Sequence, residues 1–160
     1  MKQIILQFVG ASDLCSRTIE WFGKGHFSHV DLVMDDGRLL GARSDVVGGS
    51  PAGVWPRKPN YETWSNISRI SIDVTEAQYD AFWTFANSKI GTEYNKLGIV
   101  GFVTGTSLTN ANDLFCSQYG AEAVSASGLF PHPIGLPANK IDPVALYGIL
   151  SPWGTITTIQ

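Results

Sequence analysis

Cysteine is scarce in this chain of 160 residues, which contains only Cys15 and Cys116. Two thiols are too few for the disulfide framework that stabilises many small secreted domains, although they still allow a single bridge. We expect both thiols to be free. Histidine is scarce as well, with three residues, and the cysteines and histidines show none of the closely spaced pairs that zinc sites favour. We therefore expect neither a metal site nor a cofactor.

Charge of one sign is also lacking, since 11 Lys and Arg stand against 14 Asp and Glu, for a net charge of -3. This balance gives no basis for binding nucleic acid or an anionic membrane surface. No apolar run approaches the roughly 20 residues of a membrane-spanning helix, so we expect a soluble protein without a stable membrane anchor. The apolar stretch at 3–9 is too short for a signal peptide, which predicts synthesis in the cytoplasm. Release by lysis, delivery within a particle and the oligomeric state stay open.

A phosphate-binding glycine loop is missing too, because Gly48 and Gly49 are followed by neither a lysine nor a helix pattern. The chain shows no internal repeat and no low-complexity tract. Its length and its 44% hydrophobic content suit one core. We expect a single domain over residues 1–160.

Strand and helix patterns alternate through the chain. Runs of β-branched and apolar residues predict strands at 3–9, 27–34, 38–43 and 67–74, with a turn at 35–37 and a short strand near 53–55. Apolar spacing predicts helices near 13–22, 76–90, 113–124 and 143–150. The second helix is the clearest, because Thr75 and Gln78 have the spacing of a capping box. Cys15 falls on the apolar stripe of the first helix and is interpreted as a core residue.

Cys116 lies near the start of the third predicted helix, with Asn112 and Asp113 as candidate caps. The first turn of a helix has unpaired backbone N–H groups and the positive end of the helix dipole, and both favour a thiolate. Because the thiolate is the reactive form, Cys116 is a candidate nucleophile.

A nucleophilic thiol needs a base, and histidine suits that role because its pKa lies near neutrality. His26 falls in a glycine-flanked loop and His132 lies between two prolines, whereas His29 is within a predicted strand. Strand alternation places Asp31 on the same side as His29. We therefore pair Cys116 with His29. Taken alone, the same residues also fit a structural role, as a buried thiol and a hydrogen-bonded strand histidine.

The order of motifs resembles the circularly permuted branch of the NlpC-type papain-like cysteine hydrolases. The motifs are Ser28-His29-Val30 with Asp36-Gly37 at the hairpin turn, then Gly91-Thr92-Glu93-Tyr94-Asn95, then Phe115-Cys116-Ser117-Gln118 opening a helix. In that branch the histidine strand precedes the cysteine helix. The resemblance extends from the first strand to the Cys116 helix and depends on motif order and spacing.

What the resemblance implies is a thiolate–imidazole pair in which Cys116 attacks a carbonyl group and His29 takes and returns the proton. Tyr94 matches the family's tyrosine, which implies that it lines the substrate groove or donates to an oxyanion. Backbone N–H groups at Cys116 are further oxyanion candidates.

The family commonly places a polar or acidic orienting residue on the strand after the hairpin turn, where this chain has Gly41. It also commonly has glutamate where this chain has Gln118. The orienting role then falls to Asp31 as third member of the catalytic group, or is missing. Arg43, beside Gly41, could hold a substrate carboxylate.

Together these features predict an α+β domain with the permuted papain-like fold, in which an antiparallel sheet packs against helices. The predicted function is a cysteine peptidase or amidase that cleaves an amide bond through an acyl-enzyme. The first candidate substrate is a peptide of the bacterial cell wall. Two alternatives stay open. One is a lipid acyl hydrolase or acyltransferase of the same fold. The other is an inactive binding or structural module of a virus particle or toxin assembly.

Overall fold

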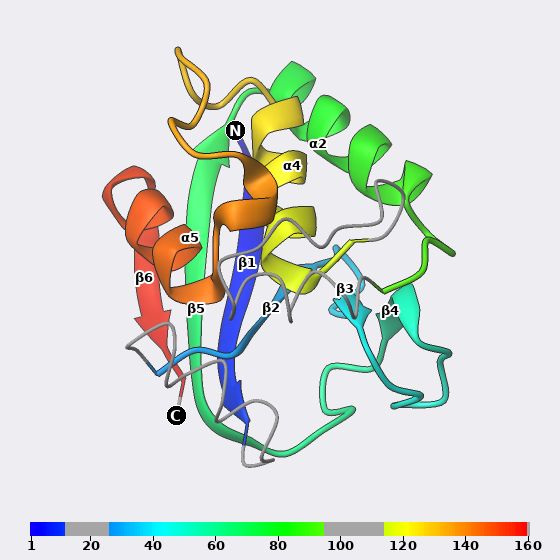
Figure 1. Cartoon of the computed structure of the whole chain (residues 1–160). Helices are drawn as coiled ribbons and strands as arrows, with labels where there is room; N and C mark the ends of the chain where they lie inside the picture. Colours follow the sequence, from blue (N-terminus) through cyan, green and yellow to red (C-terminus); the bar gives the residue numbers. More distant parts are fainter. Residues whose placement is uncertain (12–25, 95–113, 160) are drawn as a thin grey trace.

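The computed structural model describes residues 1–11, 26–94 and 114–159. Over these residues the strands form one antiparallel sheet in the order β4-β3-β2-β1-β5-β6 (Figure 1). The strands are β1 (Lys2–Ala11), β2 (His29–Val33), β3 (Leu39–Arg43), β4 (Gly53–Arg57), β5 (Trp64–Val74) and β6 (Thr155–Thr158). The α-helices are α2 (Glu76–Ser88), α4 (Cys116–Ala126) and α5 (Pro143–Leu150). Two 3₁₀ turns, η1 (Ala138–Lys140) and η2 (Ser151–Trp153), flank α5. The predicted α+β class is therefore confirmed, with an antiparallel sheet and helices.

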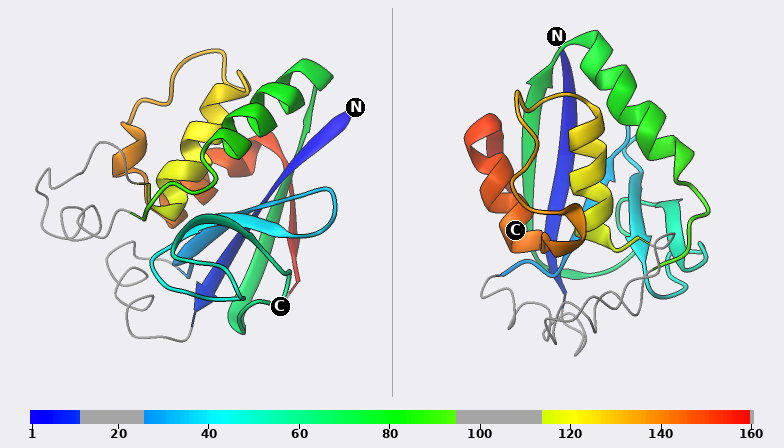
Figure 2. Two further views of the ribbon diagram at one scale, coloured as in Figure 1. Left: turned by 90° about the vertical axis from the view of Figure 1, so that its right-hand side faces the viewer. Right: turned by 45° about the horizontal axis from the view of Figure 1, so that its top comes forward.

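The helices cover one face of the sheet, as the left view of Figure 2 shows. Side chains alternate between the two faces of a strand, so every second residue of β1 points towards the helices. Ile4, Leu6 and Phe8 of β1 are fully buried there, in one core cluster with Phe82 of α2 and Val124 of α4. This core fixes α4 against the centre of the sheet.

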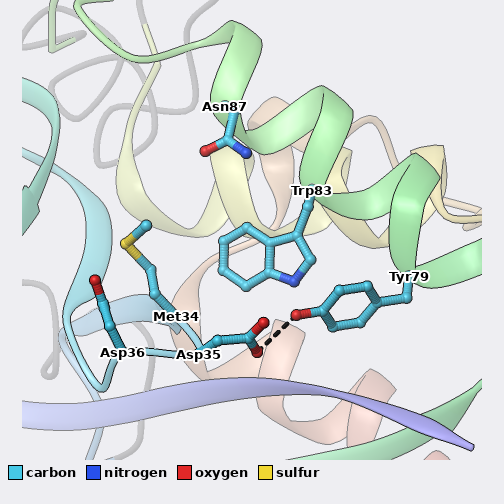
Figure 3. A pocket seen from close by; sticks show the side chains of 6 residues that line it. All are labelled: Met34, Asp35, Asp36, Tyr79, Trp83 and Asn87. Carbon is cyan, nitrogen blue, oxygen red and sulfur yellow. Dashed lines mark hydrogen bonds between the residues drawn. The ribbon is translucent and has the colours of Figure 1, made fainter.

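Helix α2 begins as its sequence predicts. The Thr75 side chain accepts a hydrogen bond from the backbone N–H of Gln78, and the Gln78 side chain bonds the backbone N–H of Thr75, which completes the capping box. Further along, the Tyr79 hydroxyl donates to Asp35 at 2.6 Å (Figure 3). This hydrogen bond ties α2 to the turn between β2 and β3.

Helix α4 begins later than predicted. Its N-cap is Phe115, without a side-chain cap, and Cys116 is its first residue. The preceding residue Leu114 forms a parallel bridge with Tyr94 instead of a helical turn. The prediction of a helix from 113 with a polar cap is therefore wrong, because pairing with a distant segment holds Leu114 extended.

Other differences lie at the ends of the chain. The sequence predicts no strand at the position of the edge strand β6, because this Thr-rich segment lacks apolar alternation. The predicted helix at 13–22, with Cys15, lies outside the described residues. None of the helices in the described ranges has the length and apolar character needed to cross a membrane.

Replacing the α2 cap tests how the helix is stabilised. We expect Thr75→Ala to lower the free energy of unfolding by about 0.5–2 kcal/mol, because the N–H of Gln78 loses its partner. Urea denaturation gives the value. The matched control is Thr84→Ala at an exposed position in the same helix, which should leave stability equal or slightly higher. Equal losses in both variants would contradict a capping role for Thr75.

Candidate active site

Strand β2 divides its residues between two environments. Val30 and Leu32 belong to the core under the helices, whereas His29 and Asp31 alternate to the other side of the strand. Both polar residues are buried, with 5% and 1% of their surface exposed. Because burying polar groups is costly, such residues require partners inside the protein.

His29 and Asp31 are hydrogen-bonded to each other. His29 Nε2 lies 2.8 Å from Asp31 Oδ1, which confirms that the two side chains share one side of β2. With Nε2 engaged, Nδ1 is the ring nitrogen left for another group. The Tyr61 hydroxyl donates to the second carboxylate oxygen, Asp31 Oδ2, at 2.9 Å, and lies 3.2 Å from His29 Nε2.

The electrostatics of the pair follow from this geometry. Burial by itself would lower the pKa of His29, but the Asp31 charge, and then Cys116, raise it from 6.5 to about 9. Burial would likewise raise the pKa of Asp31, yet His29, through its charge and its hydrogen bond, and the Tyr61 hydrogen bond hold that pKa below its ordinary value. The pair therefore favours imidazolium beside carboxylate at neutral pH.

Cys116 approaches this pair from the helix side. It is a free thiol, 4% exposed, at the first position of α4, and Figure 1 shows that end of α4 beside β2. Both its charge and its hydrogen bonding contribute to the raised pKa of His29, so the two side chains are in direct interaction. The structure thus brings Cys116 to the pair of His29 and Asp31, a set consistent with a nucleophile, a base and an orienting carboxylate.

Gly41, where the resemblance implied an orienting residue, has a steric reason to be glycine. The β2–β3 register pairs Leu32 with Leu40, which sets Gly41 opposite Asp31. A Cβ atom on Gly41 would overlap Asp31 Oδ1 and lie 3.0 Å from Asp31 Cγ. The carboxylate of Asp31 therefore occupies the space that a side chain at position 41 would need.

Sequence reasoning missed the aromatic surroundings of His29. Trp64 stacks on the imidazole, with ring centres 6.0 Å apart and planes at 12°, and Tyr61 meets Trp64 edge to face at 5.3 Å. Tyr61 precedes β5 in a stretch without periodicity, so no strand or helix pattern marks it. The available signal was two aromatic residues three positions apart in a loop.

Arg43 and Tyr94 are the two residues that the sequence predicts to bind substrate. The Arg43 guanidinium pairs with Asp45 and with Glu62, at 2.8–3.0 Å. Binding a substrate carboxylate would require Arg43 to exchange one of these partners. Tyr94 is half-buried, and its backbone bridge to Leu114 places it beside the segment that leads into α4. Its proposed role in the groove stays a prediction.

A hollow of about 340 Å³ lies at the other end of β2 from His29 (Figure 3). It is lined by Met34, Asp35, Asp36, Tyr79, Trp83 and Asn87. This set contains two carboxylates but neither a thiol nor a histidine, so it lacks the nucleophile and base found at Cys116. Across the described part of the chain, no three His, Cys, Asp or Glu side chains group closely enough to hold a metal ion.

No protein-family model matches the chain, and no curated protein matches it. Among solved structures, the chain is similar to one titled as the crystal structure of metalloprotein yiiX from Escherichia coli O157:H7, DUF1105. That match has a TM-score of 0.57 at 11% sequence identity and covers 99% of this chain and 96% of that chain. At this identity the likeness shows a shared fold and leaves function to the residues of the site.

The raised pKa of His29 predicts a loss of stability at alkaline pH. The folded protein keeps a proton that the unfolded chain releases above pH 6.5, so this contribution is complete below pH 6.5 and disappears as pH rises through about 9. Its full size is about 3 kcal/mol, to be measured by urea unfolding at several pH values. In Asp31→Asn, burial keeps the pKa of His29 low and this loss should vanish.

The matched control for that substitution is Asp36→Asn in the same hairpin. Asp36 is exposed and pairs with Arg38, away from His29. It should keep the wild-type decline of stability between pH 6.5 and 9. A decline of the same size in Asp31→Asn would show that another group causes it.

Proposed function

We propose that this protein is a cysteine hydrolase that cleaves an amide bond, with Cys116 as nucleophile and His29 as base, on a permuted papain-like arrangement of the fold. One observation carries the proposal: a buried free thiol at the first position of a helix interacts with an imidazole whose Nε2 is bonded to a buried carboxylate. A structural thiol has no need of such a partner, whereas a nucleophile does.

The reaction would proceed in two halves. In the resting enzyme His29 already holds the proton given up by Cys116; the sulfur then bonds to the carbonyl carbon of the substrate, and the C–N bond breaks as His29 passes that proton to the departing amine. Water then attacks the thioester, again with His29 as base, and the acid leaves as the thiol re-forms. Asp31 stays ionised throughout and holds His29 Nε2, while backbone N–H groups at the start of α4 are placed to stabilise the oxyanion.

The substrate class rests on the resemblance in motif order, which points to peptides of the bacterial cell wall. Phospholipid is the rival substrate that the same resemblance implies. The solved structure with a similar fold is described as a metalloprotein, and a chelator therefore belongs in the assay. In the proposed mechanism the thiol and the imidazole supply the nucleophile and the proton transfer, so we expect hydrolysis to be unchanged by EDTA.

Two substitutions test the proposal directly. We expect Cys116→Ala and His29→Ala to lower the hydrolysis of peptidoglycan peptides by about 10³-fold or more, because each removes a group that reacts with the substrate. Iodoacetamide near neutral pH should label wild-type Cys116 rapidly and the His29→Ala protein slowly, with mass spectrometry locating the label. Cys15→Ser is the control thiol and should keep full activity.

Full hydrolytic activity in the Cys116→Ala protein would exclude the proposed mechanism. Turnover of phospholipid vesicles but not of peptidoglycan fragments would keep the nucleophile and change the substrate class. If Cys116 reacts with iodoacetamide as slowly in the wild type as in His29→Ala, the thiol is not activated, and the inactive structural module becomes the better explanation.

A further inference from the structure

The Asp31 carboxylate needs more than His29 to hold it, because it is almost fully buried. A buried carboxylate must have its oxygens hydrogen-bonded, and an ion pair in the interior contributes stability only when its geometry is well defined. One oxygen bonds His29 Nε2 and the other accepts from the Tyr61 hydroxyl. His29 belongs to β2 itself, whereas Tyr61 comes from another part of the chain.

The space for the carboxylate comes from Gly41 on β3. A Cβ atom there would overlap Asp31 Oδ1, and the backbone of Gly41 cannot easily withdraw to make room. Its carbonyl oxygen accepts a 2.9 Å hydrogen bond from buried Arg57, and it is paired with Trp55 of β4. Because β3 is held between two strands, a larger side chain at 41 would move the carboxylate rather than the strand.

The hydroxyl that bonds Asp31 comes from a ring that is itself fixed. Tyr61 packs edge to face on Trp64, and the guanidinium groups of Arg43 and Arg57 lie 5.6 and 5.8 Å from its ring centre. A Cβ on Gly48 would come within 2.6 Å of Tyr61 Cβ, so the loop before β4 is also shaped around this ring. Such enclosure keeps the hydroxyl aimed at the carboxylate.

We propose that Gly41 and Tyr61 are positioning residues, which act through Asp31 to hold the His29 ring in the orientation that Cys116 requires. Gly41 does so by leaving room and Tyr61 by donating a hydrogen bond. This inference rests on the proposed function for its catalytic meaning. Its physical content, the placement of a carboxylate against an imidazole, can be measured without any substrate.

The first experiment is an NMR titration of the His29 ring in Gly41→Ala. The added methyl group displaces the carboxylate from the imidazole, so the pKa of His29 should fall from about 9 to below about 8 in the folded protein. The matched control is Gly148→Ala, where a Cβ would meet no atom within 4 Å, and its His29 should titrate as in the wild type. A folded Gly41→Ala protein whose His29 still titrates near 9 overturns the role of Gly41.

A double substitution keeps this test decisive if Gly41→Ala does not fold. Asp31→Gly alone removes the carboxylate, and burial should then bring the pKa of His29 below 6.5. Adding Gly41→Asp returns a carboxylate from the opposite position on β3, and the pKa of His29 should rise above 6.5 again. A double variant that titrates like Asp31→Gly would show that the space at position 41 does not serve the imidazole.

Tyr61→Phe tests the hydroxyl. Because its hydrogen bond lowers the pKa of Asp31, its loss should raise the pKa of the Asp31 carboxyl, measured by carbon NMR, and slow the alkylation of Cys116 about threefold or more. Tyr147→Phe, whose hydroxyl meets Ser68 instead, should change neither value. If Tyr61→Phe lowers only the stability to urea, Tyr61 is structural and the inference fails.

These outcomes separate the inference from the proposed function. Suppose that the wild-type protein hydrolyses no amide, but that the pKa of His29 changes in Gly41→Ala and in the double variant as described. The positioning role then stands and the proposed enzymatic function is excluded. If the protein is active but neither substitution changes the pKa of His29 as described, the proposed function stands and the positioning role is excluded.

Discussion

The buried pair of His29 and Asp31 is the interaction on which the rest of the site depends. Removing two ionised groups from water costs several kcal/mol for each ion, and mutual attraction offsets this only with good geometry and complete hydrogen bonding. The neighbours of the pair meet that requirement, with a hydroxyl on the free carboxylate oxygen and an indole stacked on the imidazole. An exposed pair would be weakened by water and salt, and the imidazole would lose the charge that a nearby thiolate needs.

The hydrophobic core positions the other half of the site. Gly120 of α4 faces the sheet and α5: a Cβ there would lie at ordinary contact distance from Leu6 and Val30, and only 3.1 Å from Leu146 of α5. Val30 lies between His29 and Asp31 on the strand, and Cys116 is about one helical turn before Gly120. The contact that seats α4 on β2 therefore also brings the thiol to the imidazole. Stability and chemistry share one strand, in which Val30 and Leu32 belong to the hydrophobic core and the alternate residues, His29 and Asp31, form the polar pair.

Parts of this arrangement could be predicted from the sequence because they depend on local patterns. Period-two alternation placed His29 and Asp31 on one side of a strand, and the capping box placed the start of α2. The start of α4 was misplaced because Leu114 is held extended by Tyr94, a partner outside any local window. Tyr61 lies in a loop without a period. Gly41 looked like the loss of a functional residue, and only the pairing across strands shows that it makes room for Asp31.

The same pairing makes the site sensitive to strand register. A shift of β3 by one residue would place Leu40 or Ala42 opposite Asp31, and either side chain would compete with the carboxylate for space. The register is set at the hairpin turn, where Gly37 adopts a φ of 82° and Met34 exchanges backbone hydrogen bonds with Gly37 and Arg38. A turn several residues from His29 thus determines whether the carboxylate reaches it. Because a slipped hairpin would put a side chain where the Asp31 carboxylate lies and disturb its hydrogen bonds, the cost of burying a poorly bonded charge disfavours the wrong register.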